Sequence, residues 1–174
     1  MRRTPKAKMQ INQSSPDFEL PDLDGNLHRL RHYRGRIVIV NFWSCECPHS
    51  ERTDKSIMAM LMQWRDVVML SIASNRSENV EALKKAADAR RLPTVLLDAN
   101  CRVADLFEAQ TTPHVFVIDR EGILRYRGSV DDFTFRNRIP TRFYLDLAVE
   151  SLLNGQLPAL AESPAYGCAI VREI

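Results

Sequence analysis

An apolar run that ends in a cysteine-containing turn constrains this chain more than any other feature. Residues 37–40 are all apolar, as in a buried strand, and residues 48–64 have the apolar spacing of a helix. Cys47 lies between the two, directly before Pro48, and proline is favoured at the first position of a helix. A thiol at such a turn faces backbone N–H groups and the positive end of the helix dipole, which favour the thiolate. Cys47 is therefore predicted to be a nucleophile, and His49 could add a favourable positive charge beside it.

Length and composition predict one well-packed domain with a small net charge. A chain of 174 residues with 45% hydrophobic content can build one well-packed core, and its formal net charge of +2 does not favour nucleic acid. No apolar stretch follows the first residues and no membrane-spanning run occurs, so we expect a cytoplasmic protein with no membrane association. In a reducing compartment, cysteines are better explained as catalytic, metal-binding or incidental than as a disulfide framework.

Strand and helix patterns alternate along the chain and predict an α/β fold with a parallel-biased central sheet flanked by helices. We expect a flexible arm over residues 1–14, which carries Arg2, Arg3, Lys6 and Lys8, then one domain over residues 15–157 and a tail over residues 158–174 that carries Cys168. A hairpin is expected around residues 24–26. The expected strands cover residues 36–43, 67–73, 94–98, 114–119 and 123–128, and the expected helices cover residues 48–64, 77–90, 102–109 and 141–154.

The cysteine turn and three further stretches resemble the thioredoxin-like redoxins, which include membrane-anchored thiol-disulfide oxidoreductases and AhpC/TSA-type peroxiredoxins. The resemblance rests on residues 41–50, on the Pro-Asp-Phe phrase from residue 16, on Thr112-Pro113 and on a closing Gly-Cys at residues 167–168. It covers nearly the whole chain, from residue 16 to residue 170. It implies a thioredoxin-like fold with a central mixed sheet and an N-terminal hairpin.

The resemblance also assigns roles to residues around the nucleophile. Cys47 takes the nucleophile position, and Ser50 stands where a dithiol oxidoreductase has its second cysteine, so a C-x-x-C disulfide cannot form. Ser44 matches the peroxiredoxin hydroxyl that bonds peroxide or thiolate, although Val40 replaces the proline that begins the full peroxiredoxin motif. Ser44 and Ser50 are therefore expected to offer hydroxyl groups to the thiolate, and the Cys-Pro-His sequence favours a functional His49.

A substrate-binding wall is implied by the same resemblance. Thr112 and Pro113 match the cis-proline loop that faces the nucleophile, and Trp43 and Pro48 would complete the surface that binds an extended substrate. Arg136 lies close to the place of a peroxiredoxin catalytic arginine.

A second thiol must complete the reaction of Cys47. Attack on a disulfide leaves a mixed disulfide and attack on a peroxide leaves a sulfenic acid, and either product needs another thiol to clear it. Cys45, Cys168, a small thiol and a partner protein all remain candidates, whereas Cys101 and His114 are expected to be structural.

The residues therefore predict a thiol-dependent redox enzyme, with antioxidant peroxide reduction and disulfide exchange both open. The substrate would be a peroxide or a protein or low-molecular-weight disulfide, and an external thiol of the thioredoxin or glutathione type would supply electrons. No organic cofactor is expected, because the sequence has no glycine-rich phosphate loop.

Two alternatives come from other classes of protein. Cys45, Cys47 and His49 occupy alternate positions, and two thiolates with an imidazole suit Zn²⁺ or Cu(I). Against this site, Pro48 and the helix start break the extended geometry, and no second ligand pair follows. The other alternative is a redox-inactive interaction module that uses the methionine-rich helix surface of residues 58–62, which could also serve a homodimer.

Overall fold

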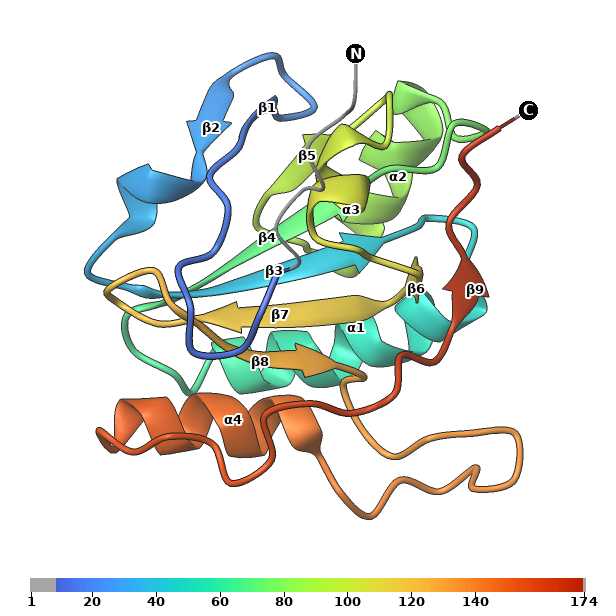
Figure 1. Cartoon of the computed structure of the whole chain (residues 1–174). Helices are drawn as coiled ribbons and strands as arrows, with labels where there is room; N and C mark the ends of the chain where they lie inside the picture. The colour runs from blue at the N-terminus through green and yellow to red at the C-terminus, as the bar shows by residue number, and fades with distance from the viewer. Residues whose placement is uncertain (1–8, 174) are drawn as a thin grey trace, which may run out of the picture.

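A five-stranded mixed sheet forms the centre of the computed structural model, which describes residues 9–173 (Figure 1). The strand order is β5-β4-β3-β7-β8. Strands β3, β4 and β5 are parallel, whereas β7 and β8 run antiparallel to their neighbours. The strands are β3 (Ile37–Trp43), β4 (Val67–Ala73), β5 (Val95–Leu97), β7 (His114–Ile118) and β8 (Leu124–Gly128). The predicted α/β class is confirmed, and the two antiparallel strands make the sheet mixed.

Strand β3 is buried along its whole length because both of its faces are covered. Side chains of a strand alternate between the faces, so Val38, Val40 and Phe42 enter one core cluster while Ile37 and Ile39 enter another. The first cluster includes residues of the hairpin and α3, and the second includes residues of α1 and α4. The apolar run of the sequence thus becomes the central strand that leads to Cys47.

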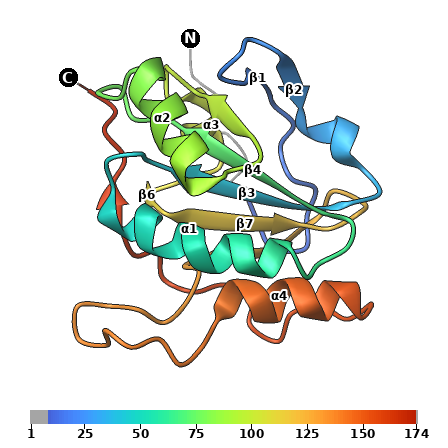
Figure 2. The ribbon, with the colours of Figure 1, turned by 180° about the vertical axis from the view of Figure 1, so that it is seen from behind.

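In residues 9–173, four α-helices flank the sheet: α1 (Pro48–Leu61), α2 (Val80–Arg90), α3 (Arg102–Leu106) and α4 (Tyr144–Leu153). Figure 2 shows α1 and α2 from behind, with α4 below α1. Helix α1 ends before the predicted residue 64, and the Trp64 indole then donates a hydrogen bond to Glu150 of α4 at 2.8 Å. Helix α2 begins later than predicted because Asn79, not Ser77, caps it by accepting the N–H of Ala82 at 2.8 Å.

The N-terminal hairpin is present as predicted, with β1 (Glu19–Pro21) paired to β2 (Leu27–Arg29) and a 3-10 helix (Leu30–Tyr33) after it. The predicted arm over residues 1–14 is wrong for residues 9–14. Met9 is buried in the core, and the Asn12 N–H donates to the carbonyl of Leu124 at 2.8 Å. The arginines and lysines of residues 1–8 lie outside the described residues.

The end of the chain, predicted as a tail, packs along the β8 edge and then pairs with β6. We call residues 161–172 the C-terminal strap. Its first part bonds to β8 through Ser163, whose N–H donates to the carbonyl of Arg127 at 3.1 Å. Its middle forms β9 (Cys168–Ala169), which pairs with β6 (Thr111–Thr112). Both ribbon views show β9 at the end of the molecule where α1 begins (Figures 1 and 2).

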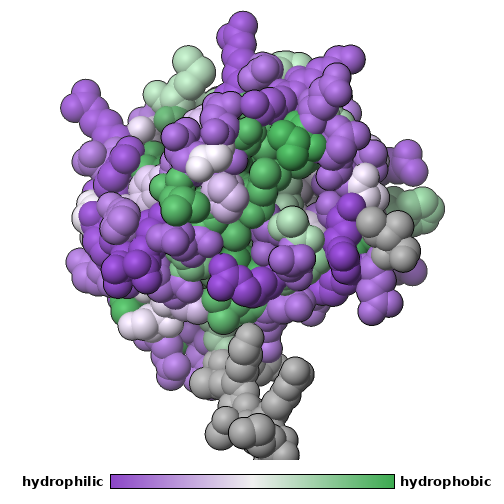
Figure 3. Space-filling view, turned by 90° about the horizontal axis from the view of Figure 1, so that it is seen from above, coloured by the Kyte–Doolittle hydropathy of each residue, from purple (hydrophilic) through white to green (hydrophobic). Residues whose placement is uncertain are grey.

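Helix length and surface polarity are the features of the described residues that bear on contact with a membrane or with water. No helix there is both long and apolar enough to span a bilayer. Figure 3 shows the molecule from above, the side of the hairpin, α2 and α3, as a mainly polar surface with a stripe of apolar side chains through its middle.

Candidate active site

Cys47 lies at the junction of β3 and α1, where the sequence places it. It is the N-cap of α1, with extended backbone angles (φ −85°, ψ 117°), and Pro48 follows at the first turn. The backbone N–H of Ser50 is directed at the Cys47 sulfur and lowers its pKa. A helix N-terminus offers free N–H groups and positive partial charge, so this position favours a thiolate, as predicted.

A buried set of polar contacts fixes the turn that carries Cys47. The Trp43 indole N–H donates to Asp54 at 3.0 Å, and Arg90 donates both to Asp54 at 3.2 Å and to the carbonyl of Cys45 at 2.8 Å. Trp43 has no exposed surface, so the predicted contact with substrate is not seen in this arrangement of the chain. Trp43 instead supports the turn from below.

The second cysteine next to Cys47 comes from the strap. Cys168 is paired in register with Thr112 across β6 and β9, and the Cys47 thiol donates to the carbonyl of Thr112 at 3.0 Å. The peptide bond between Thr112 and Pro113 is cis. Cys47 is only 2% exposed, whereas Cys168 is half-buried, and all four cysteines of the chain are thiols. The strap therefore covers the nucleophile and brings a second thiol to it.

The two neighbouring thiols have pKa values that are pushed apart. Burial alone would raise the pKa of Cys47, but hydrogen bonds from the Cys168 thiol, the Thr112 side chain and backbone N–H groups lower it. Burial and the adjacent Cys47 sulfur raise the pKa of Cys168 to about 11. Cys47, with the lowered pKa, is suited to attack as a thiolate. Cys168, with the raised pKa, is suited to stay protonated until the second step of the reaction.

Cys45, the other candidate for the second thiol, faces a different environment. Burial and the Glu78 carboxylate raise the pKa of Cys45 to about 12. Its side chain packs against the cluster formed by Trp43 and α2, away from the strap. Of the two cysteines that the sequence leaves open, the geometry favours Cys168.

The predicted hydroxyl donors to the thiolate form other contacts. The Ser44 hydroxyl donates to Glu78 at 2.7 Å, and the Ser50 hydroxyl accepts the N–H of Ser44 at 3.4 Å. Neither of these two hydroxyl groups forms a hydrogen bond with Cys47 within residues 9–173, so the expected contacts with the thiolate are not seen. The Thr112 hydroxyl is buried and has no hydrogen-bond partner in residues 9–173 while Cys47 is a thiol, so its proton is free to be donated to the Cys47 thiolate, which lowers the pKa of Cys47.

A cluster of aromatic rings that was not predicted from the sequence borders the site. The His49 ring packs edge-on against Tyr166 of the strap, with 5.3 Å between ring centroids, and against Phe133 at 5.9 Å. The Arg52 guanidinium lies 4.2 Å from the centre of the Phe133 ring and is paired with Asp131 at 2.8 Å. His49 thus packs between the strap and the loop that carries Phe133. The sequence predicted only a positive charge beside the Cys47 thiolate for His49, and not this packing role. Exposed Pro48 lies at the edge of this group.

The geometry does not support the metal-binding alternative. Cys45 faces α2, Cys47 faces Thr112, and His49 packs on aromatic rings, so the three side chains diverge. In the part of the chain that the structure describes, no three His, Cys, Asp or Glu side chains are grouped so that they could hold a metal ion. Cys101 is buried, and its thiol donates to the carbonyl of Ser74 at 2.9 Å, as a structural cysteine would.

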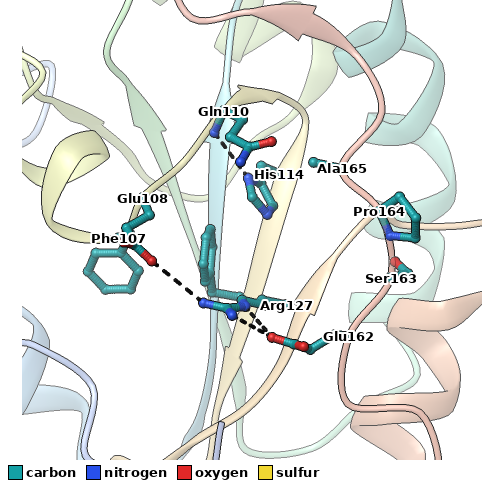
Figure 4. A pocket seen from close by; sticks show the side chains of 10 residues that line it. Phe107, Glu108, Gln110, His114, Arg127, Glu162, Ser163, Pro164 and Ala165 are labelled. Carbon is teal, nitrogen blue, oxygen red and sulfur yellow. Dashed lines mark hydrogen bonds and ion pairs between the residues drawn. The ribbon is translucent and has the colours of Figure 1, made fainter. Parts of the chain in front are cut away.

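His114 lies in a separate cavity of about 430 Å³ under the first part of the strap (Figure 4). Its Nδ1 accepts the N–H of Gln110 at 3.2 Å, and burial together with Arg127 lowers the pKa of His114 to about 4. The ring is turned toward Arg127, which is itself paired with Glu162 at 2.5 Å. His114 is therefore a neutral, buried strand residue, consistent with the structural role expected for it.

The Thr112 hydroxyl provides a first test of how the thiolate is stabilised. In Thr112→Val the isosteric side chain cannot donate a hydrogen bond, so we expect the pKa of Cys47 to rise toward its ordinary value of 9.0. The ultraviolet absorbance of the thiolate, followed against pH in a Cys45→Ser/Cys101→Ser background, measures this pKa. Thr111→Val is the matched control, because the Thr111 hydroxyl donates to the carbonyl of Pro113 instead. An unchanged titration midpoint in Thr112→Val would rule out this donor.

Gly167 provides a test of the strap. A β-carbon at this position would lie 2.2 Å from the carbonyl oxygen of Thr112, which is backbone and cannot easily move. Gly167→Ala should therefore lift β9 from β6 and speed alkylation of Cys47 by iodoacetamide. Ala169→Ser, which adds one atom at an exposed position of the same strand, should leave the rate unchanged. Equal rates for Gly167→Ala and the unmodified protein would show that the strap does not limit access.

The sequence matches the model of a known protein family and several named relatives. The model of the AhpC/TSA family matches residues 11–127. The thiol-disulfide oxidoreductase ResA of Geobacillus kaustophilus (strain HTA426) is 29% identical over 120 residues, which cover 68% of this chain and 69% of that protein.

Two solved structures define the fold. An uncharacterized conserved protein from Geobacillus kaustophilus superposes with a TM-score of 0.87 and 25% identity, covering 96% of this chain and 94% of the other. The thioredoxin domain of a thiol-disulfide oxidoreductase from Bacteroides vulgatus superposes with a TM-score of 0.62 and 18% identity, covering 75% and 94%. The fold is the predicted thioredoxin-like one.

Proposed function

Because this chain belongs to the AhpC/TSA family and is a thiol-dependent oxidoreductase of its redoxin group, we propose that it exchanges disulfides through Cys47 and Cys168. The observation that carries the proposal is the Cys168 thiol beside Cys47, with the pKa of Cys47 lowered and that of Cys168 raised. Such a pair divides the work between an attacking thiol and a resolving thiol.

The proposed reaction consumes one substrate disulfide and oxidises one pair of protein thiols. The Cys47 thiolate attacks one sulfur of the substrate, so a bond forms to Cys47 while the other substrate sulfur leaves as a thiolate. That leaving thiolate can take the proton of Cys168, whose sulfur then attacks the Cys47 sulfur. A Cys47–Cys168 disulfide forms, and the second substrate sulfur leaves as a thiolate that takes a proton from water. The substrate gains two electrons and two protons, and an external thiol reductant of the thioredoxin or glutathione type returns the protein to its dithiol form.

The residues around Cys47 support disulfide exchange better than peroxide reduction. The Ser44 hydroxyl, expected to assist a peroxide, donates to Glu78 instead. Arg136 forms no hydrogen bond or ion pair with the cysteine site within residues 9–173, and it lies exposed on a loop. Exposed Pro48 and the cis peptide at Thr112-Pro113 remain as the surface that an extended disulfide substrate would meet once the strap moves.

Single-turnover kinetics distinguish the two reactions. The fully reduced protein would be mixed with one equivalent of hydroxyethyl disulfide or of hydrogen peroxide and quenched in acid, and the thiols that remain on the protein itself would be counted by mass spectrometry after alkylation. We expect the disulfide to remove two protein thiols faster than peroxide does. A faster reaction with peroxide would overturn the exchange assignment in favour of a peroxidase. A matched Cys101→Ser variant should behave like the unmodified protein, because Cys101 is remote and structural.

A further inference from the structure

The loop between β8 and α4, residues 129–143, lies next to the Cys47 site. Both ribbon views show it extending from the body of the molecule at the end where β9 lies and α1 begins (Figures 1 and 2). Phe133 of this loop contacts the rings of His49 and Tyr166, with centroids 5.9 Å and 6.1 Å away. His49 is two residues from Cys47. A molecule bound along the loop would therefore lie beside the strap that covers the nucleophile.

The outer part of this loop is positively charged. Residues 133–143, which we call the basic loop, contain Arg136, Arg138 and Arg142 and no aspartate or glutamate. All three arginines are exposed, and within residues 9–173 none of their guanidinium groups is paired with a carboxylate. The formal net charge of the whole chain is only +2, so this is a local concentration of charge beside the active site.

Hydrogen bonds hold the basic loop in a defined shape. The Asp132 carboxylate accepts the N–H groups of Thr141 at 2.9 Å and of Arg142 at 3.1 Å, which joins the two ends of the loop. Its tip is closed by Thr134, whose N–H donates to the carbonyl of Asn137 at 2.9 Å. The two acidic residues before the loop are thus engaged, Asp132 with the loop backbone and Asp131 with Arg52. A preorganised surface loses little entropy when it binds a partner.

Two large apolar side chains are presented among the arginines. Phe135 is 75% exposed and Ile139 is 79% exposed. The Arg138 guanidinium lies 5.6 Å from the centre of the Phe135 ring. Exposed aromatic and aliphatic anchors surrounded by arginine are the composition of protein-binding hot spots.

We propose that the basic loop docks an acidic polypeptide substrate, whose disulfide then reaches Cys47. The proposal rests on the disulfide-exchange function and specifies the class of substrate. Carboxylates of the substrate would pair with Arg136 and Arg138, and an apolar side chain would lie against Phe135 or Ile139. Opposite charge raises the rate of encounter and orients the partner before the chemical step.

Two synthetic peptide disulfides test the proposal. They have equal length and one leucine each, and they differ only in carrying glutamates or lysines on both sides of the cysteine. At low ionic strength we expect the acidic peptide to oxidise the protein at least about tenfold faster, with the difference shrinking as salt is added. Equal rates for the two peptides would overturn the proposal.

Charge-reversal variants locate the effect. Arg136→Glu/Arg138→Glu should remove or reverse the preference for the acidic peptide while leaving the rate with neutral hydroxyethyl disulfide unchanged. The matched control is Arg36→Glu/Arg65→Glu, which makes the same charge change at exposed positions before β3 and β4, at the opposite end of the sheet from Cys47. Equal loss of preference in both variants would assign it to net charge and contradict the proposal.

Two further measurements separate the remaining outcomes. Fluorescence anisotropy of the same peptides with serine in place of cysteine measures docking alone, so failure of the exchange reaction would not hide it. Tighter binding of the acidic peptide by the unmodified protein than by Arg136→Glu/Arg138→Glu supports the proposal. Sedimentation with phosphatidylserine vesicles tests the other outcome. If the unmodified protein binds the vesicles, the double variant does not, and neither peptide is preferred, the loop binds lipid headgroups and the proposal is wrong.

Discussion

Replacement of Cys47 by serine should abolish disulfide exchange. A serine hydroxyl is not ionised at neutral pH, so the hydrogen bonds that favour the Cys47 thiolate would stabilise no nucleophile. We expect the single-turnover rate with hydroxyethyl disulfide to fall on the order of a thousandfold or more. Cys45→Ser should retain the rate, because burial and Glu78 raise the pKa of Cys45 to about 12.

The Cys47→Ser protein should remain folded, because the exchanged atoms are similar in size and the turn is fixed by other residues. Trp43, Asp54 and Arg90 keep their contacts with one another. Thermal unfolding followed by circular dichroism checks this point. A folded Cys47→Ser protein that still exchanges disulfides at the original rate would exclude Cys47 as the nucleophile.

Replacement of Cys168 by serine should separate the two chemical steps. The serine hydroxyl can still donate a hydrogen bond to the Cys47 thiolate, so attack on the substrate should continue. Without the second thiol the mixed disulfide on Cys47 should persist, and turnover with an external thiol should slow about a hundredfold, because an intramolecular thiol acts at a high effective concentration. Intact-protein mass spectrometry after acid quenching measures the trapped adduct.

Cys101→Ser is the matched control. It should form no trapped adduct, because the Cys101 thiol donates a hydrogen bond to the carbonyl of Ser74 in the core and takes no part in the reaction. Rapid loss of the mixed disulfide from Cys168→Ser would contradict the resolving role of Cys168. It would point to a small thiol or a partner as the resolving group.

The strand, the turn and the helix around Cys47 were predictable because their signals are local. An apolar run of strand length, a cysteine before proline and helical spacing after it define β3 and α1 within about thirty residues. The position of the Thr112-Pro113 loop opposite Cys47 was predicted only from the resemblance to redoxins, because a proline before an apolar strand does not by itself show which cysteine it faces.

The choice of Cys168 over Cys45 as the second thiol could not be made from the sequence, because the position of Cys168 depends on a long-range pairing. Cys168 reaches Cys47 only since β9 pairs with β6, more than fifty residues earlier in the chain. Cys45, which is closer in sequence, is turned toward α2 instead. No periodic pattern of residues 158–174 indicates that this segment pairs with β6.

Several side-chain roles were missed for a similar reason. The Ser44 hydroxyl was expected at the thiolate, but Glu78, thirty-four residues away, accepts its hydrogen bond. Phe133 and Tyr166 meet around His49 from two loops that no local signal relates. Such contacts follow from the assembled fold and not from any one stretch of sequence.

Peptide mapping without reduction tests the central assignment most directly. The reduced protein would be treated with one equivalent of oxidised glutathione, alkylated in acid and digested with trypsin, which leaves Cys45 and Cys47 in one peptide, residues 37–52. Fragmentation of that peptide then identifies the bonded sulfur. We predict a disulfide that joins Cys47 to Cys168. A bond between Cys45 and Cys47, or an unmodified Cys168 beside a glutathionylated Cys47 that persists, would contradict the account.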